Sequence, residues 1–279
     1  MKIGIIGASG LVGSHLARSL ATQHELSTPR HAELDITDTA QVQAWCQRIK
    51  PELVINCSTI DVDRCEREPQ LAEALNVAGP QALAAAAREL GASVMHFSTN
   101  YVFDGERHGH LYTQADAAEA LNVYGRTKRA GEAAVQAANP SSYVIRTSWV
   151  FGEGKESFLS TLPRKLRAGE RIRAITDVWA SATYVNDLVE RTRAILARQH
   201  FGLYHVVNAG TLSYADFADE AARLCRADAA ALIERVSESD AQRLAERPRY
   251  TPMACALSAE LDLSPLRDWR AALAAYVES

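Results

Sequence analysis

The sequence lacks three features that would assign it to a class at once: paired cysteines, a large excess of one charge, and a long unbroken apolar run. Its five cysteines form no C-x-x-C pair, which argues against a disulfide framework and a cysteine zinc site. Lysine and arginine total 30 against 34 aspartates and glutamates, so a net charge of -4 provides no basic surface for nucleic acid. The apolar runs are too short to span a bilayer. These absences predict a cytoplasmic protein that binds neither nucleic acid nor membrane.

The 279 residues show instead a regular alternation of short apolar runs with helical patterns. The apolar runs are "MKIGIIG", "ELST", "ELVINCS", "ASVMHFST" and "SYVIRTSWVFG", and helices are predicted between them. Strands separated by helices pair in parallel, and near-continuous apolar strands belong in a sheet covered on both faces. The pattern predicts an α/β fold with a Rossmann-type, doubly wound parallel sheet.

This alternation of strands and helices becomes less regular after about residue 150. A loop-like "GEGKES", a helix near "FLSTLPRKLRAG", a strand "YHVVNA" and a terminal helix "PLRDWRAALAAYV" follow. We therefore expect residues 1–150 to form a dinucleotide-binding domain. Residues 151–279 are expected to form most of a smaller, partly discontinuous substrate-binding domain, with some segments returning to the first domain.

The first candidate site is "GASGLVG", which lies between the first predicted strand and the first predicted helix. Gly7, Gly10 and Gly13 permit a tight turn and a close approach of the backbone to a pyrophosphate, whose charge the helix N-terminus stabilises. The alternative is a purely structural turn, but its position after an N-terminal apolar strand favours a dinucleotide site. Leu11 and Val12, within the same segment, belong to the predicted cofactor site.

The second predicted strand, in "ELSTPRH", has no acidic residue after its apolar core but is followed by Arg30. An acid there is typical of NAD sites, whereas an arginine can pair with the 2′-phosphate of NADP. The expected cofactor is NADP(H), with NAD(H) as the alternative, and Arg30 could equally be a solvated loop residue. Downstream, Asp35 and Ile36 are placed to meet the adenine, unless Asp35 only flanks a helix start.

Tyr124 and Lys128 in "NVYGRTKRAGE" are four residues apart, so they share one face of a predicted helix. Such a pair could serve chemistry, because a phenol can supply a proton to a reacting group. A nearby cation stabilises phenolate, so we expect Lys128 to lower the pKa of Tyr124. Thr99 ends the strand "VMHFST", where open α/β sheets present ligand-binding groups. An incidental Tyr–Lys pair on a surface helix is the alternative.

Together these segments resemble the extended short-chain dehydrogenase/reductase family, in particular its 4-dehydrorhamnose reductase branch. The resemblance is carried by "PELVINCS", "VDRCEREPQLAEALNV", "HFSTNYVFDG", "LNVYGRTKRAGE", "IRTSWVFG" and "ATYVNDL", with a weaker "RPRYTPMACALS" and "LRDWRAAL". These strings cover nearly the whole chain.

The resemblance implies an NADPH-preferring reductase of the 4-keto group of a nucleotide-linked 6-deoxyhexose, most simply dTDP-4-dehydro-L-rhamnose. It implies catalytic roles for Thr99, Tyr124 and Lys128, and a second role for Tyr124 and Lys128 in binding the cofactor. It places Cys57 and Ser58 beside the cofactor, and Asp61, Val62, Asn100, Tyr101, Trp149 and Tyr184 around the substrate. It also allows a homodimer.

The sequence departs from the family pattern at three places. Asn100 stands where the family usually has Asp, "NCSTIDVD" is one residue shorter than usual, and "ASATY" replaces "GSPTY". These changes bear on the substrate more than on the chemistry. Two other functions stay open: a nucleotide-sugar epimerase, and a non-catalytic regulatory subunit like the relatives associated with methionine adenosyltransferase. His108 and His110 in "RHGH" come without a third candidate ligand, so no metal is expected.

Overall fold

The computed structural model describes residues 1–154 and 156–279, apart from the side chains of residues 258 and 259. Its centre is a six-stranded sheet whose neighbouring strands are all parallel. In spatial order the strands are β2 (Glu25–Ser27), β1 (Lys2–Ile6), β3 (Leu53–Asn56), β4 (Ser93–Thr99), β5 (Ser142–Thr147) and β10 (Gly202–His205). From β1 the chain adds β2 on one side and then β3 on the other, so the order of strands reverses between β1 and β3. Open α/β sheets bind ligands at this position.

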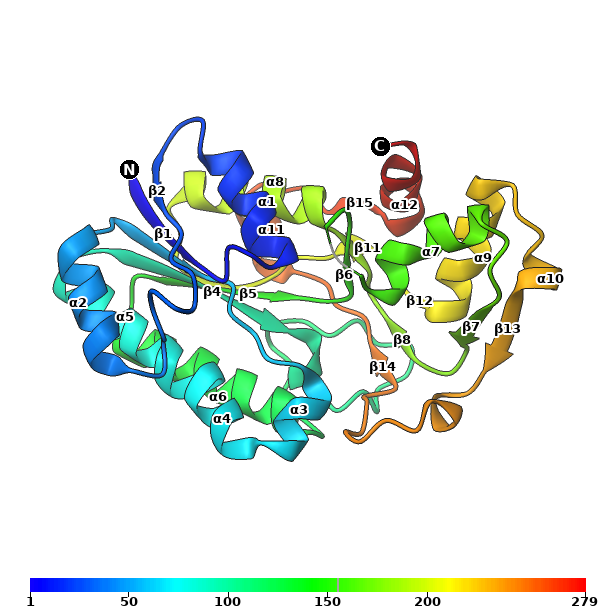
Figure 1. The fold of residues 1–279 in the computed structure, drawn as a ribbon, viewed down its shortest axis with the longest axis horizontal. Helices are drawn as coiled ribbons and strands as arrows, with labels where there is room; N and C mark the ends of the chain where they lie inside the picture. The colour runs from blue at the N-terminus through cyan, green and yellow to red at the C-terminus, as the bar shows by residue number, and fades with distance from the viewer. Residues whose placement is uncertain (155) are drawn as a thin grey trace.

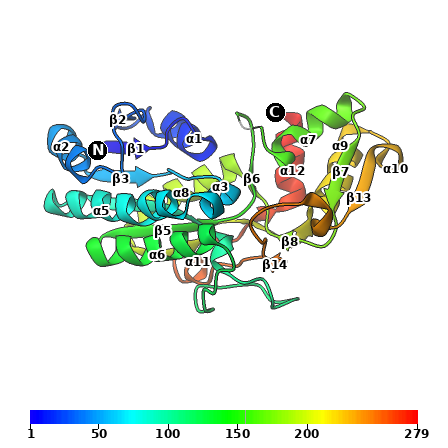
Figure 2. The same cartoon turned by 60° about the horizontal axis from the view of Figure 1, so that its bottom comes forward.

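Helices cover both faces of this sheet, as Figures 1 and 2 show. On one face α1 (Leu11–Leu20) and α8 (Val185–Arg198) pack over Ile3, Ile5 and Ile55. On the other face the helices are α2 (Thr39–Ile49), α5 (Gly79–Glu89) and α6 (Val123–Ala138). The predicted doubly wound α/β fold is confirmed.

The segment "PQLAEALNVAGPQALAAAARELG" is not one continuous α-helix but contains a π-helical turn. After α3 (Val62–Arg67), the chain forms α4 (Pro69–Glu73), the π turn Ala74–Ala78 and then α5. Pro80 has no N–H, so the Asn76 carbonyl lacks its usual i+4 donor, and the helix widens there. The same carbonyl lies against Gly131 of α6, where an added Cβ would come within 2.0 Å of it. The proline therefore creates the bulge, and the glycine makes room for it. Gly91 ends the segment with a left-handed φ of 69°.

The remaining strands are short and form small two- and three-stranded sheets. They are β6 (Val150–Phe151), β7 (Ile172–Ile175), β8 (Trp179–Ala180), β9 (Thr183–Tyr184), β11 (Asn208–Ala209), β12 (Leu212–Ser213), β13 (Ile233–Val236), β14 (Tyr250–Thr251) and β15 (Leu266–Asp268). The helices between them are α7 (Phe158–Arg167), α9 (Tyr214–Cys225), α10 (Ala229–Leu232), α11 (Ala256–Glu260) and α12 (Trp269–Glu278). A second apolar core containing Phe151, Phe217 and Trp269 holds α7, α9 and α12 together.

Two segments beyond residue 150 lie with the large sheet. The predicted strand "YHVVNA" contributes only Tyr204 and His205 to β10, which pairs with β5, and its last two residues form β11. The α8 helix packs against α1. Figure 1 shows α7, α9, α10, α12, β7 and β13 gathered at the opposite end of the molecule. We keep 1–150 and 151–279 as the proposed domains, with α8 and β10 as returning segments. Of the helices formed by the described residues, none is both long and apolar enough to cross a membrane.

Candidate active site

A cavity of about 710 Å³ lies at the carboxyl ends of the sheet strands and reaches the second core. Its walls come from the glycine segment, the ends of β3, β4 and β5, the start of α6 and the α7 and α9 helices. Eleven of the residues predicted for the site line it: Gly10, Leu11, Val12, Gly13, Cys57, Val62, Thr99, Asn100, Tyr101, Tyr124 and Trp149. The structure therefore brings these predicted residues together around one space.

The glycine loop forms one wall of this cavity. Gly7 has a left-handed φ of 75°, and its carbonyl accepts a hydrogen bond of 3.0 Å from the Gly10 N–H. A Cβ on Gly13 would approach the Gly7 carbonyl oxygen to 2.3 Å, so a side chain there would force the turn open. α1 begins directly after Gly10, and its first N–H groups have no intrahelical acceptor. This cradle suits the pyrophosphate of a dinucleotide.

Arg30, Asp35 and Ile36 lie beyond the end of β2, outside this cavity lining. Arg30 is exposed, and its backbone N–H donates to Glu33 at 2.8 Å. Asp35 accepts hydrogen bonds from the backbone and hydroxyl of Thr37, which lower the pKa of its carboxyl. Ile36 is buried in the core with α2 and α5. A second hollow of about 450 Å³ adjoins the strand end and is lined by Ser27, Thr28, Pro29, Glu33, Trp45 and Arg48. Glu33, in the loop that follows β2, places an acidic side chain in this hollow, and the local sequence pattern did not indicate it.

Tyr124 lies in the first turn of α6 and faces the cavity. Asn122 caps that helix by accepting a hydrogen bond of 2.8 Å from the Gly125 N–H, which fixes where the helix begins. Burial raises the pKa of the Tyr124 phenol, while hydrogen bonds with the hydroxyls of Thr59 and Thr99 oppose that rise. The phenol therefore keeps its proton at neutral pH and lies beside two hydroxyl groups.

Lys128 lies one turn further along α6, beneath the cavity, with only 2% of its surface exposed. Its Nζ lies 2.6 Å from the carbonyl oxygen of Phe97 and 3.3 Å from Nε2 of His96. Burial lowers the pKa of Lys128 to about 8. The expected lowering of the Tyr124 pKa is wrong as a net direction: burial outweighs the groups that favour the phenolate, and the pKa is raised.

Thr99 and Asn100 close the end of β4. Thr99 Oγ1 accepts from the Tyr101 N–H at 3.2 Å and lies 3.3 Å from Asn100 Oδ1. The Asn100 amide donates to Thr251 Oγ1 at 2.7 Å, which ties the large sheet to β14. Asn100 therefore holds the cavity wall together, a role that a neutral amide can fill.

An aromatic wall forms the far side of the cavity. Trp149 has a left-handed φ of 41° and stacks on Tyr214 with ring centroids 3.9 Å apart, and Phe158 meets Tyr214 edge-on. A non-glycine residue in this region of φ is strained, and such strain is concentrated at ligand sites. The wall presents flat apolar surface on which a base or a sugar can stack.

Three other predicted residues, Asp61, Ser58 and Tyr184, are not part of the cavity lining. Asp61 is exposed and caps α3 by accepting from the Arg64 N–H at 3.0 Å. The backbone N–H and the hydroxyl of Ser58 both donate to the side-chain Oδ1 of Asn56. Tyr184 is buried in the second core and stacks on Phe151. Cys57 lines the cavity, but burial raises the pKa of its thiol to about 12, so it is a thiol and not a thiolate.

Sequence reasoning missed several groups in or below the cavity. Thr59 was within a quoted segment, but only the fold brings its hydroxyl to Tyr124. Tyr214 lies ninety residues after Tyr124 in the chain, and no local pattern relates the two. Glu132, in the quoted "AGE", forms a buried ion pair with Arg146 of β5, with Nη2–Oε2 at 2.7 Å and both side chains 6% exposed. This pair fixes α6 to the sheet directly below the site.

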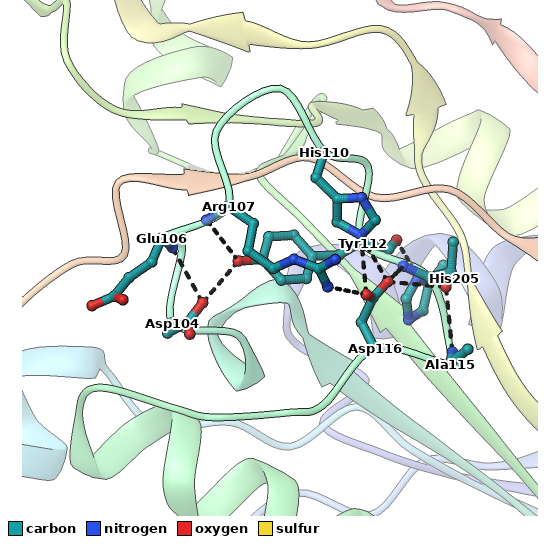
Figure 3. A network of polar contacts seen from close by, with 9 residues as sticks. Asp104, Glu106, Arg107, His110, Tyr112, Ala115, Asp116 and His205 are labelled. Atoms are coloured by element: carbon teal, nitrogen blue, oxygen red, sulfur yellow. Dashed lines mark hydrogen bonds and ion pairs between the residues drawn. The ribbon is translucent and has the colours of Figure 1, made fainter.

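The "RHGH" loop is organised by an acidic side chain (Figure 3). His110 Nε2 lies 3.0 Å from both carboxylate oxygens of Asp116, which also accepts from the Thr113 N–H at 2.7 Å. Although burial pushes the pKa of Asp116 upward, these hydrogen bonds hold it well below its usual range. His108 lies against the rings of Trp179 and Tyr250. Among the described residues, no cluster of three or more His, Cys, Asp or Glu side chains could hold a metal ion.

The parallel sheet, the glycine cradle and the Thr–Tyr–Lys arrangement define a member of the extended short-chain dehydrogenase/reductase class. Within that class, the family model described as the RmlD substrate binding domain matches residues 1–279, and the chain belongs to that family.

Similar proteins share the full length of the chain. A dTDP-4-dehydrorhamnose reductase of Mycolicibacterium smegmatis is 39% identical, covering 98% of this chain and 84% of that protein. A dTDP-4-keto-6-deoxy-D-glucose reductase of Streptomyces niveus is 32% identical, covering 96% and 94%. A dTDP-4-dehydrorhamnose reductase of Bacillus anthracis, solved in complex with NADP, superimposes with a TM-score of 0.94 at 29% identity, covering 100% and 99%.

Proposed function

We propose that this chain is an NADPH-preferring reductase of the 4-keto group of a nucleotide-linked 6-deoxyhexose, namely dTDP-4-dehydro-L-rhamnose. The observation that carries the proposal is the meeting of the Tyr124 phenol with the Thr59 and Thr99 hydroxyls inside the cavity that contains the glycine cradle. The names of the similar reductases support the choice of substrate. A protonated phenol beside a dinucleotide site is the arrangement that ketone reduction requires.

Each part of the cavity has a separate role in the proposed reaction. The glycine loop and the N-terminus of α1 bind the cofactor's pyrophosphate. When bound, NADPH supplies the hydride. Thr99 donates a hydrogen bond to the substrate's keto oxygen and orients it, and Tyr124 holds the proton that this oxygen takes as it gains negative charge. The Lys128 ammonium, one helical turn below, stabilises the phenolate that remains on Tyr124.

The substrate is proposed to extend from this centre toward the second core. Val62, Asn100 and Tyr101 contact the sugar, and the nucleotide lies along the wall made by Trp149, Tyr214 and Phe158. An elongated ligand suits a cavity between two parts of a chain. Calorimetric titration with dTDP-rhamnose in the presence of NADP tests this arrangement, and Trp149→Ala should weaken the binding.

Failure of every nucleotide-linked deoxysugar to bind at millimolar concentration, with NADP still binding, would overturn the proposal. The chain would then be better described as a cofactor-binding regulatory subunit.

The rate of reduction is expected to fall as the pH rises through about 8. Lys128 has a lowered pKa of about 8, so its ammonium is present below this value and is lost above it. Tyr124 has a raised pKa, so its phenol keeps its proton over the same range and does not cause the fall. The pH profile of kcat/KM reports groups of the free enzyme and is the measurement to make. Lys128→Arg, which stays charged, should lose this alkaline limb; an unchanged limb in that variant would contradict the assignment.

The preference for NADPH is expected to depend on Arg30. Its exposed guanidinium, just beyond β2, can pair with the 2′-phosphate, and Arg30→Ala should reduce the NADPH-over-NADH affinity ratio about tenfold. Fluorescence titration with each cofactor measures the ratio. Arg18→Ala, which removes an exposed arginine from the far end of α1, is the matched control and should leave the ratio unchanged. Equal affinities for the two cofactors in the unaltered protein would contradict the expectation.

A further inference from the structure

Below the cavity, a buried chain of polar groups joins α6 to the middle of β4 and to the end of β3. Lys128 Nζ lies 3.3 Å from His96 Nε2, and His96 Nδ1 lies 3.2 Å from Asn56 Nδ2. The three side chains are 2%, 0% and 1% exposed. Buried polar groups must satisfy each other, so the direction of each hydrogen bond in this chain can be worked out from its neighbours.

The Asn56 amide has only one possible orientation. Its Oδ1 accepts from the Ser58 backbone N–H at 3.0 Å and from the Ser58 hydroxyl at 2.6 Å. A backbone N–H can only donate, so the amide atom facing it must be the oxygen. The Asn56 NH₂ group therefore faces His96.

This orientation determines the tautomer of His96. Because Asn56 Nδ2 donates, His96 Nδ1 must accept, and it carries no hydrogen. Complete burial holds the pKa of His96 well below its usual value, so the ring is neutral. A neutral imidazole has one N–H, and here it must be on Nε2, the atom that faces Lys128.

An Nε2–H aimed at Lys128 needs an acceptor. An ammonium group has three donors and no lone pair, whereas an uncharged amine has two N–H groups and one lone pair. The amine can accept from His96 and still donate to the Phe97 carbonyl oxygen, 2.6 Å away. The geometry is therefore satisfied by an amine and leaves two facing donors if Lys128 is charged.

We propose that His96 is a positioning residue for Lys128: its Nε2–H, fixed by Asn56 and Ser58, donates to Lys128 Nζ and so favours the uncharged amine over the ammonium in the cofactor-free protein. The inference rests on the proposed function only for the use that the reaction makes of Lys128. The proposal gives the chain a lysine whose charge responds to its surroundings, so a nucleotide phosphate or a phenolate nearby can favour its protonation.

Other ionisable groups also face Lys128. Glu132, one turn away on α6, favours the ammonium, and Tyr124 shares its helical face. The Cys57 and Cys65 thiols also lie near Lys128, but burial raises their pKa to about 12 and about 11, so they stay neutral. Desolvation outweighs the effect of Glu132 and lowers the pKa of Lys128. His96 acts in the same direction as desolvation, because a donor aimed at Nζ stabilises the amine.

Nitrogen NMR of the histidine rings in the cofactor-free protein tests the tautomer directly. The expected spectrum shows His96 protonated on Nε2 and unprotonated on Nδ1. The His96→Phe variant, which lacks these signals, assigns them. Hydrogen on Nδ1, or a doubly protonated ring, would overturn the proposal. This measurement is made on the unaltered protein, so it holds even if the variant is unstable.

Carbon NMR of the lysine Cε signals tests the consequence for Lys128, with Lys128→Met used for assignment. His96→Phe keeps a ring of similar size but removes the donor, so the Lys128 titration midpoint should rise by about one pH unit. His200→Phe changes an exposed histidine that is not part of this hydrogen-bonded network, so it should leave the Lys128 midpoint unchanged. An unchanged midpoint in a folded His96→Phe protein would overturn the proposal. Neither measurement uses substrate, so absence of reductase activity would leave both results intact and would count only against the proposed function.

Discussion

Replacing Tyr124 by Phe is expected to lower the turnover of the 4-keto sugar by about 10²-fold or more, since general acid catalysis contributes that order of rate. The phenol faces the cavity with the Thr59 and Thr99 hydroxyls beside it, so removing its oxygen should not destabilise the fold. Phe keeps the ring and its edge-on contact with Tyr101, so the fold and NADP affinity should be retained. Steady-state kinetics and a parallel NADP titration measure the two quantities.

Tyr143→Phe is the matched control. Tyr143 is a buried tyrosine of β5 whose ring meets Phe201, away from the cavity lining. Loss of its hydroxyl should leave turnover near that of the unaltered protein. Near-normal turnover of Tyr124→Phe would contradict the assignment of the proton donor, and a loss of NADP binding in that variant would point to a disturbed site instead.

Glu132→Ala is expected to lower the free energy of unfolding by about 3–5 kcal/mol, because it leaves a charged arginine buried without its partner. Arg146 binds Glu132 through two hydrogen bonds, Nε–Oε1 at 2.9 Å and Nη2–Oε2 at 2.7 Å. Ser98 also donates to Glu132, and the Arg146 guanidinium lies 5.2 Å from the Phe103 ring centroid. Urea denaturation measures the change.

Glu68→Ala gives the comparison at the surface. Glu68 pairs with Arg64 one turn away on the helix surface, where both side chains are about half exposed, and solvent screens such pairs. Its loss should be small beside that of Glu132→Ala. Similar losses in the two variants would show that the buried pair contributes no more than a surface pair, and that α6 is held to the sheet by apolar contacts.

The local sequence was enough to predict the fold because each element satisfies its own pattern. The apolar runs became the strands of the sheet, and the glycine segment became the turn into α1. The Tyr124–Lys128 spacing indicated a shared helical face, and Asn122 fixes that face by capping the helix. The π turn before α5 was missed because it follows from one absent N–H at Pro80 and from close packing on Gly131.

The environment of the site could not be predicted in the same way. The pKa of Lys128 depends on burial and on His96, which comes from a different strand. Tyr214 reaches the cavity from α9, and Thr251 reaches Asn100 from β14. Contacts between residues far apart in the chain are set by the packing of the whole fold, so the sequence indicated which groups react but not what surrounds them.

The most direct test of the account is the reduction itself. The unaltered protein is mixed with NADPH and dTDP-4-dehydro-L-rhamnose, the absorbance of NADPH is followed, and the sugar product is identified. The account predicts that NADPH is consumed in equal amount with the formation of dTDP-L-rhamnose, and that the rate falls as the pH rises through about 8. Binding of NADPH without its oxidation, with this substrate and with the other nucleotide-linked 4-keto-6-deoxyhexoses, would contradict it.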